Sequence, residues 1–220
     1  MDELVKSLVK NGVIVSESIR RAFTKIDRAH FVPGDVIDLA YEDTALPIGE
    51  GQTISQPYTV AFLLELLSPQ AGDHILDMGS GSGWQTALLA EIVGTKGQIY
   101  AIELVRNLYE FGKGNLEKYS ELLKRVKLYC QNAEPGLPKE AEVAGGFDGI
   151  IVAAEVTEVP KAWRAQLKVG GRLVYPQGGS IYKEVKLNDS EWQEPISGIC
   201  LCPICKSVAQ DKLWSRTPDS

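Results

Sequence analysis

A glycine-rich turn between an apolar strand and an apolar helix constrains the fold of this chain more than any other feature. Residues 74–89 read His-Ile-Leu-Asp-Met-Gly-Ser-Gly-Ser-Gly-Trp-Gln-Thr-Ala-Leu-Leu. The glycines Gly79, Gly81 and Gly83 let the backbone take positive φ and approach a ligand closely. The carboxyl end of the strand and the amino terminus of the helix add oriented dipoles. This order predicts a nucleotide-type ligand at the end of a strand in an α/β sheet.

Strands and helices alternate after the glycine turn, which predicts a mostly parallel sheet. Apolar runs predict strands at 98–102, 126–130, 147–153 and 172–175, helices at 106–119 and 159–167, and an irregular loop at 131–146. We expect Gly170-Gly171 to form the turn that leads into strand 172–175. Two further strands, 181–187 and 196–202, follow without an intervening helix, so they should pair antiparallel at one edge of the sheet.

The first third of the chain combines helical periodicity with one long irregular segment. Apolar spacing predicts a helix in the first eleven residues and a second helix after Ser16, its expected N-cap. Segment 28–56 has no periodicity, and a loop of that length is usually functional. A helix resumes at Pro57, with Ser55 or Gln56 as its cap. We expect one domain over 1–220, divided into 1–56 (N-terminal helices and loop), 57–187 (core) and 188–220 (edge strand and tail).

Charge and hydropathy exclude two classes of partner. The 220 residues carry a net charge of -6, and the basic residues do not gather, which argues against a nucleic-acid-binding face. No apolar run reaches the roughly 18 residues that a membrane helix needs. Asp2 and Glu3 stand where a signal peptide would be basic. We therefore expect a cytoplasmic monomer without nucleic-acid or membrane partners.

An acidic residue after the second strand adds to the ligand prediction. Glu103 follows Gly83 by twenty residues, and an acid there accepts hydrogen bonds from ribose hydroxyls in dinucleotide enzymes and methyltransferases alike. The glycine spacing is G-x-G-x-G, whereas the dinucleotide fingerprint is G-x-G-x-x-G. Asp77 would repel a pyrophosphate but suits the cationic groups of S-adenosylmethionine. The residues favour a methyltransferase over a nicotinamide enzyme.

Several segments resemble the protein-L-isoaspartate O-methyltransferase family. The most specific is Gly51-Gln-Thr-Ile-Ser-Gln-Pro57, within a stretch 41–58 similar to the family's substrate loop. Segments 28–33, 75–83, 147–152 and 167–174 are also similar, so the resemblance covers roughly residues 20 to 180. The fold it implies is the Rossmann-like methyltransferase fold. This fold has a mostly parallel seven-stranded sheet with helices on both faces, here with an N-terminal helical extension.

The activity that the resemblance implies is repair of damaged proteins. A methyl group passes from S-adenosylmethionine to the α-carboxylate of an isoaspartyl residue in a protein or peptide. The ester then closes to a succinimide, and hydrolysis returns part of it to aspartate. A carboxylate is already ionised at pH 7, so the transfer requires alignment and no general base. We accordingly expect His30 and His74 to be structural.

Site residues follow from the same matching. The resemblance implies that Ser55 is the active-site serine, whose hydroxyl orients the acceptor carboxylate, with Thr53 as a possible second donor. The alternative is that Ser55 only caps the helix at Pro57. The cofactor residues that it implies are Asp77, Gly79, Ser80, Gly81, Gly83 and Glu103. Asn132 stands where the family has an acid near the adenine, and would offer its amide instead.

Two features leave alternatives open. Glu155 replaces a small residue near the expected substrate mouth, where a carboxylate disfavours an anionic acceptor unless it points to solvent. A carboxyl methyltransferase with a different acceptor is therefore one alternative. A non-catalytic, cofactor-binding recruiter of damaged proteins is another. Cys200, Cys202 and Cys205 have no fourth ligand nearby, so we expect free thiols and no metal site.

Overall fold

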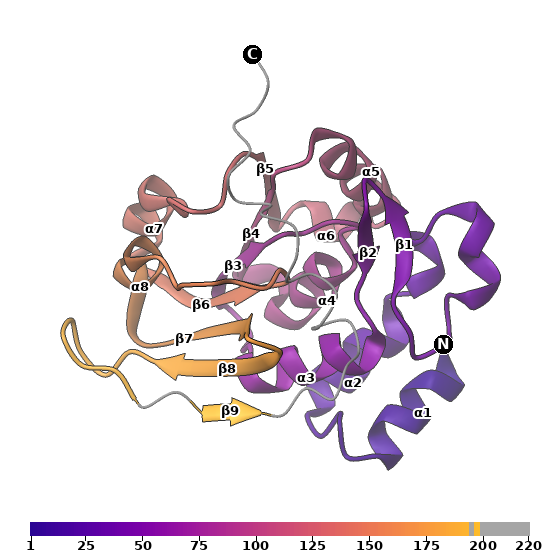
Figure 1. Ribbon diagram of the computed structural model, residues 1–220, viewed down its shortest axis with the longest axis horizontal. Coiled ribbons are helices and arrows are strands. Elements are labelled where there is room, and N and C mark those ends of the chain that lie inside the picture. Colours follow the sequence, from indigo (N-terminus) through magenta and orange to yellow (C-terminus); the bar gives the residue numbers. More distant parts are fainter. Residues whose placement is uncertain (194–195, 199–220) are drawn as a thin grey trace.

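The computed structural model describes residues 1–193 and 196–198, and its centre is a seven-stranded sheet (Figure 1). The strand order is β5-β4-β3-β6-β7-β8-β9. Neighbours from β5 to β7 pair parallel, whereas β8 and β9 pair antiparallel at the edge. The strands are β3 (His74–Met78), β4 (Gln98–Glu103), β5 (Val126–Cys130), β6 (Phe147–Val152), β7 (Leu167–Gln177), β8 (Ser180–Val185) and β9 (Ile196–Gly198). The predicted seven-stranded, mostly parallel α/β sheet is confirmed.

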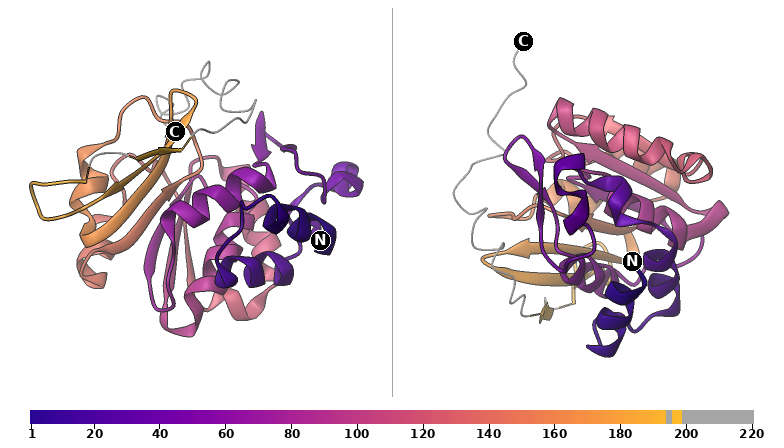
Figure 2. Two further views of the ribbon diagram at one scale, coloured as in Figure 1. Left: turned by 90° about the horizontal axis from the view of Figure 1, so that it is seen from below. Right: turned by 90° about the vertical axis from the view of Figure 1, so that its right-hand side faces the viewer.

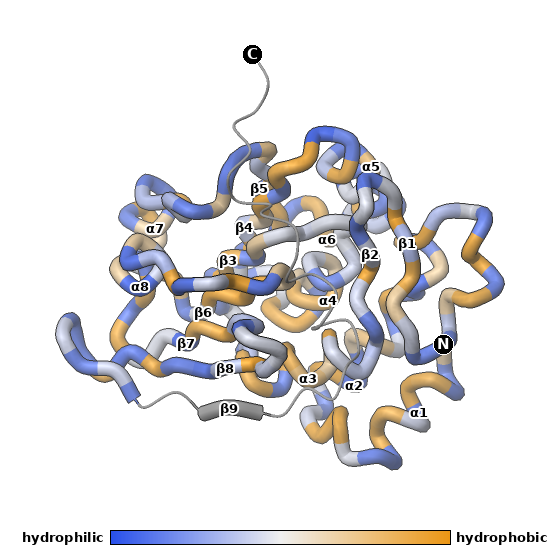
Figure 3. Tube along the Cα trace, in the orientation of Figure 1, coloured by the Kyte–Doolittle hydropathy of each residue, from blue (hydrophilic) through white to orange (hydrophobic). Residues whose placement is uncertain are grey.

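Helices cover both faces of this sheet because its central strands are apolar on both sides. Along β3, Ile75 belongs to one buried cluster and Leu76 to the other, as the twofold alternation of a strand requires. The first cluster is shared with α1 (Asp2–Lys10), α2 (Glu17–Lys25), α3 (Pro57–Leu67), α4 (Trp84–Val93), α5 (Arg106–Glu117) and α6 (Ser120–Leu123). The second is shared with α7 (Pro138–Ala144) and α8 (Lys161–Ala165). Hydrophobic segments accordingly gather at the centre of the fold (Figure 3).

The N-terminal helices are tied to the rest of the chain by α3. Glu65 accepts hydrogen bonds from the backbone N–H groups of Val15 and Ser16 and from the Ser16 hydroxyl. Ser16 occupies the predicted N-cap position of α2, but its side chain does not cap that helix. Its hydroxyl is taken by Glu65 instead. The N-terminal helices lie far from the β7–β8 edge of the sheet (Figure 2).

The segment expected to be irregular, 28–56, contains a β-hairpin that periodicity did not reveal. Two 3-10 turns, η1 (Arg28–Phe31) and η2 (Gly34–Leu39), precede the antiparallel strands β1 (Leu46–Gly49) and β2 (Gln52–Ile54). The side chain of Asn107 on α5 donates a hydrogen bond of 2.7 Å to Glu50 at the hairpin tip. The hairpin therefore stands over the sheet beside α5 (Figure 1).

Two further predictions about local structure were wrong. The loop expected at 131–146 contains α7, whose first turn begins at Pro138. Gly170 and Gly171 do not form a turn before a strand; both lie inside β7, where its register with β6 shifts. The Gly170 N–H donates to the Lys186 carbonyl, so this part of β7 continues the sheet. Strand 196–202 was predicted partly on residues outside the described part of the chain.

In the part of the chain that the structure describes, no helix is long and apolar enough to cross a membrane.

Candidate active site

A cavity opens where β3, β4 and β6 end at their carboxyl edge. The chain runs from β3 outward to β4 and β5, then returns to β6 on the other side of β3. Such a switch point is where open α/β sheets bind ligands. The cavity holds about 900 Å³ of space not filled by protein atoms, part of it open to solvent. The glycine turn and the segment Gln52–Ser55 both line it.

The glycine turn is fixed to β4 by its backbone. The N–H groups of Gly79 and Ser80 both donate to the Ile102 carbonyl, at 2.9 and 3.0 Å. The Gly81 N–H donates to Glu103 Oε2 at 2.9 Å. Gly79, Ser80 and Gly81, which the sequence proposed as cofactor residues, all line the cavity.

Gly83 has a different place from the other glycines of the turn. It is the N-cap residue of α4, with φ 84°, and it is not part of the cavity wall. A Cβ at Gly83 would meet the Gly112 carbonyl of α5 at 3.0 Å. Gly112 in turn lies against the Gly81 carbonyl so closely that a Cβ there could not fit. Sequence reasoning missed Gly112, although a glycine inside an amphipathic helix is a signal of close packing.

Glu103 is a carboxylate with acceptor capacity left over. It is buried and lines the cavity. Its Oε2 accepts from Gly81 and its Oε1 from the Val105 N–H at 2.9 Å. An ionised carboxylate offers about four acceptor positions, so about two remain for hydroxyl donors. This is the chemistry expected of a ribose-binding acid.

Asp77 lies behind the cavity wall rather than in it. The side chain is fully buried, and it accepts hydrogen bonds from Gln85 Nε2 at 2.8 Å and Thr86 Oγ1 at 2.6 Å. Burial raises the pKa of Asp77 to about 6, against the opposing effect of these two hydrogen bonds. Gln85 does line the cavity. Asp77 therefore holds the side-chain amide of Gln85, a residue that the sequence did not single out.

Asn132 is also not among the residues that line the cavity. Its neighbour Ala133 lines the cavity instead. Its Oδ1 accepts a hydrogen bond of 2.8 Å from the Glu134 N–H. The side-chain carbonyl of Asn132 is thus engaged in a local turn. Its side-chain N–H₂ group has no hydrogen bond to another described residue. The predicted amide contact with adenine remains a prediction.

Trp84, the first residue of α4, supplies a buried donor for which the described part of the chain offers no acceptor. It is 1% exposed, lines the cavity, and its indole N–H has no hydrogen-bond partner among the described residues. Buried donors usually have a partner. Together with the free acceptor positions of Glu103 and the close backbone at the glycine turn, this donor fits a bound nucleoside cofactor.

Ser55 and Thr53 line the cavity from the hairpin segment. Pro57 begins α3 and Gln56 is at the N-cap position, without a side-chain capping bond. Asp43 takes the capping role instead, because its Oδ1 accepts from the Tyr58 N–H at 2.8 Å. The alternative in which Ser55 only caps this helix was therefore wrong. The Ser55 hydroxyl has no hydrogen bond to any described residue, which leaves it available to a ligand.

Arg28 lies beneath Ser55 and is fully buried. Its Nη2 donates to the carbonyls of Ser55, at 3.1 Å, and Thr44, at 2.8 Å. Its Nη1 donates to the Ala40 carbonyl at 2.9 Å and reaches the Glu42 carbonyl at 3.4 Å. The sequence placed Arg28 in a family-like segment and gave it no role. Arginine is rarely fully buried.

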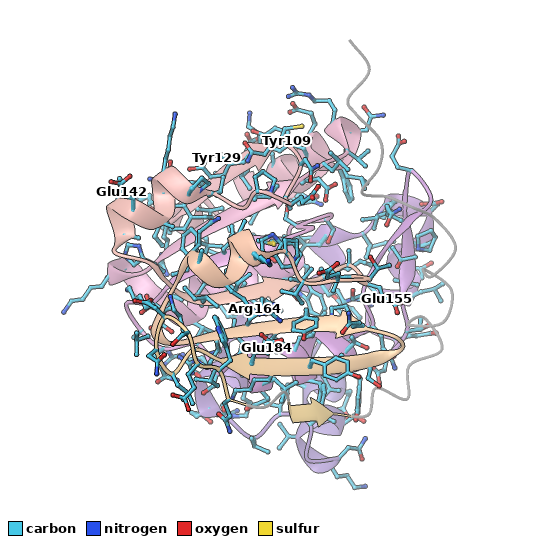
Figure 4. The ribbon with its side chains drawn as sticks, turned by 60° about the vertical axis from the view of Figure 1, so that its left-hand side comes forward. Tyr109, Tyr129, Glu142, Glu155, Arg164 and Glu184 are labelled. Atoms are coloured by element: carbon cyan, nitrogen blue, oxygen red, sulfur yellow. The ribbon has the colours of Figure 1, made fainter. Side chains whose placement is uncertain are left out.

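The remaining candidates lie away from the cavity wall. His30 Nδ1 hydrogen-bonds the Tyr119 hydroxyl and His74 Nδ1 the Tyr100 hydroxyl. Glu155 accepts from the Gly179 N–H at 3.2 Å, in the turn between β7 and β8, and is not among the lining residues. Figure 4 shows Glu155 near the end of these strands, apart from the Arg164–Glu184 ion pair. Cys200, Cys202 and Cys205 lie outside the described residues.

Comparisons with known proteins agree on one family. Residues 1–199 match the family model described as protein-L-isoaspartate(D-aspartate) O-methyltransferase. A protein-L-isoaspartate O-methyltransferase of Petrotoga mobilis is 41% identical over 202 residues, which cover 90% of this chain and 91% of the relative. One of Pyrobaculum neutrophilum is 36% identical over 208 residues and 93% and 98% of the two chains.

A solved structure is similar over nearly the same length. It is a crystal structure of a Plasmodium falciparum protein described as a protein-L-isoaspartate O-methyltransferase, in complex with S-adenosyl-L-homocysteine. The TM-score is 0.78 at 26% identity, and the match covers 91% of this chain and 95% of the other.

Proposed function

Because the chain belongs to the protein-L-isoaspartate(D-aspartate) O-methyltransferase family, we propose that it methylates the α-carboxylate of isoaspartyl residues in damaged proteins and peptides. It is an S-adenosylmethionine-dependent protein carboxyl O-methyltransferase. When bound, S-adenosylmethionine supplies a methyl group on a positively charged sulfur. The chain's own residues must then bind and align the acceptor, since a carboxylate needs no deprotonation at pH 7.

One observation carries the assignment of the site. The glycine turn and the hairpin segment line a single cavity, and the Ser55 hydroxyl has no hydrogen-bond partner among the described residues. A cofactor at the glycine turn and an acceptor at Ser55 would share this space. Proximity of this kind is what a direct displacement requires.

On the cofactor side, Glu103 would accept the ribose hydroxyls with its free acceptor positions. Gly79, Ser80 and Gly81 would let the cofactor approach the backbone, while Gly83 lets α5 pack behind the turn. Asp77 would hold the Gln85 amide at the cavity wall, and Asn132 would offer its amide at the rim near the adenine.

On the acceptor side, Ser55 would donate its hydroxyl hydrogen to one oxygen of the isoaspartyl carboxylate. Thr53, which is exposed on β2 and also lines the cavity, would be the second donor. Among the described residues that line the cavity there is no histidine. The transfer would proceed through alignment by these donors, without proton abstraction by the chain.

The test uses S-adenosylmethionine labelled in its methyl group and two peptides that differ in a single linkage. We expect label to enter the isoaspartyl peptide and not its aspartyl twin. Equal labelling of both peptides, or labelling of neither, would contradict the proposal. Tight binding of S-adenosyl-L-homocysteine without transfer to any acceptor would favour a non-catalytic recruiter. Glu155 does not line the cavity; its Oε1 accepts from the Gly179 N–H, and its Oε2 is buried with no partner among the described residues, so a different acceptor stays the alternative that the two peptides test.

We also propose that the chain folds as one domain. What supports this is the first buried cluster, which joins α1 and α2 to α3, α4 and the sheet. A single unfolding transition seen by both tryptophan fluorescence and circular dichroism is the expected result.

A further inference from the structure

We propose that Arg28 is a positioning residue whose buried positive charge holds the acceptor carboxylate at Ser55. The inference rests on the proposed function, because it takes the acceptor to be an anion bound beside Ser55. Arg28 does not line the cavity. Its charge would act on the acceptor across the backbone of Ser55, which lies between the two.

The charge of Arg28 is held by dipoles and not by a carboxylate. Its four hydrogen bonds all go to backbone carbonyls, and its Nε has no partner among the described residues. No carboxylate in the described part of the chain lies within 4.0 Å of its nitrogens. A carbonyl dipole stabilises a cation but leaves its net charge in place. The positive field of Arg28 therefore persists outside the cage of carbonyls.

Arg28 is also charged at neutral pH and poorly screened. Burial lowers its pKa to about 10, against a smaller opposing effect of Asp43, so the guanidinium stays protonated at pH 7. Asp43 is exposed to solvent and its Oδ1 is engaged by the Tyr58 N–H. Water screens the charge of Asp43 much more than that of a group with no exposed surface. The guanidinium also stacks on Trp84, 5.3 Å from the ring centroid, which keeps water away from it.

The two sides of the cavity thus differ in charge. Glu103 and Asp77 place negative charge on the side of the glycine turn, which suits a cofactor carrying positive groups. Arg28 places positive charge on the side of Ser55, which suits an anionic acceptor. Among the described residues, Arg28 is the only fully buried cation, since Lys186 is 7% exposed and pairs with Asp189.

The expected size of the effect follows from distance. Since Arg28 donates to the carbonyl of Ser55 itself, an anion bonded to the Ser55 hydroxyl would be about 8 Å from the guanidinium. At this separation, and with an effective dielectric constant of about 20, Coulomb attraction raises the affinity for the anionic acceptor roughly thirtyfold. Partial screening at the open mouth lowers this to about tenfold, which equals about 1.4 kcal/mol.

The experiment compares a charged and a neutral ligand on matched variants. The ligands are a fluorescein-labelled isoaspartyl hexapeptide and the same peptide with its isoaspartyl α-carboxyl converted to a carboxamide. Binding is measured by fluorescence anisotropy on enzyme saturated with S-adenosyl-L-homocysteine, so no transfer occurs. The variants are Arg28→Gln, which removes the charge, and Arg28→Lys, which keeps it. Their affinity for S-adenosyl-L-homocysteine and their melting temperatures are recorded as controls.

The measured quantity is the ratio of the carboxamide Kd to the carboxylate Kd. We expect Arg28→Gln to lower this ratio about tenfold and Arg28→Lys to keep it within about threefold of the wild type. If Arg28 only ties the loop to the core, both variants weaken both peptides and the ratio stays constant, which overturns the proposal. If Arg28→Gln does not fold, Arg28→Lys and the wild type still decide. A ratio near one in the wild type refutes the role of the charge. A fall of the ratio to near one in Arg28→Lys, which keeps the charge, refutes it as well.

Failure of this inference differs from failure of the proposed function. An enzyme that methylates the isoaspartyl peptide but shows an unchanged ratio in Arg28→Gln keeps its function and loses only the role of Arg28. An enzyme that does not methylate the peptide at all loses both.

Discussion

Replacement of Gly112 by alanine tests how the cofactor side of the site is built. Alanine inside a helix normally stabilises it by about 1 kcal/mol relative to glycine. At Gly112 the new Cβ would collide with the Gly81 carbonyl and would meet the Ser82 carbonyl carbon at 3.3 Å. These are backbone atoms, which cannot rotate away. Helix α5 or the glycine turn must therefore move.

The expected magnitude combines two opposing contributions. Overpacking costs about 3 kcal/mol when the neighbours are rigid, and the helix gains about 1 kcal/mol, so Gly112→Ala should lower the free energy of unfolding by about 2 kcal/mol. Displacement of Gly81 also strains its hydrogen bond to Glu103. Loss of a bond to a charged group costs about 1.5 kcal/mol, so S-adenosyl-L-homocysteine should bind about tenfold more weakly.

The same helix provides the matched control. Gly114 is exposed, and a Cβ there would meet no atom within 4 Å. Gly114→Ala should stabilise the protein by up to about 1 kcal/mol and leave the affinity for S-adenosyl-L-homocysteine unchanged. Urea denaturation and titration calorimetry measure the two quantities. Equal behaviour of Gly112→Ala and Gly114→Ala would refute the close packing of α5 on the glycine turn.

Three further predictions concern single side chains. Ser55→Ala should lower kcat/KM for an isoaspartyl peptide about tenfold to a hundredfold without changing the affinity for S-adenosyl-L-homocysteine, and an unaffected rate would remove Ser55 from the mechanism. Because burial raises the folded-state pKa of Asp77 to about 6, ionisation of this group costs stability as the pH rises from about 4 through about 6. Urea denaturation should show Asp77→Asn gaining about 3 kcal/mol relative to wild type between pH 4 and pH 7, and a pH-independent difference would contradict the shift. Glu155→Gln should leave kcat/KM within about twofold, since Glu155 does not line the cavity and its Oε1 accepts from the Gly179 N–H; a large rise in kcat/KM would show that its carboxylate repels the acceptor.

Sequence pattern predicted the parallel core well because each strand is a short apolar run between turn residues. The strand expected at 126–130 is β5 to the residue, and the strand at 98–102 is β4 less its last residue. The glycine turn was also predictable, since its spacing and the adjoining Glu103 carry the information locally. Gly79, Ser80, Gly81 and Glu103 accordingly come together in the cavity wall.

Long-range contacts account for what sequence reasoning missed. The hairpin β1–β2 contains Pro47, Gly49 and Gly51, and neither strand exceeds four residues, so no period was visible. Helix α7 spans only seven residues. The cap of α3 comes from Asp43, fifteen residues before Tyr58, whereas local rules search only adjacent positions. The burial of Arg28 depends on carbonyls that the folded loop gathers around it.

The hairpin and the glycine turn also share a physical boundary. The Cδ1 atom of Ile48 lies 3.4 Å from the position that a Cβ at Gly81 would take, and both residues line the cavity. A ligand that moves the hairpin therefore also moves the glycine turn, and a ligand at the glycine turn also moves the hairpin. Thermodynamic linkage then fixes a symmetry: whatever factor the bound nucleoside contributes to peptide affinity, the peptide must contribute to nucleoside affinity. Damaged protein and methyl donor are in this sense effectors of each other.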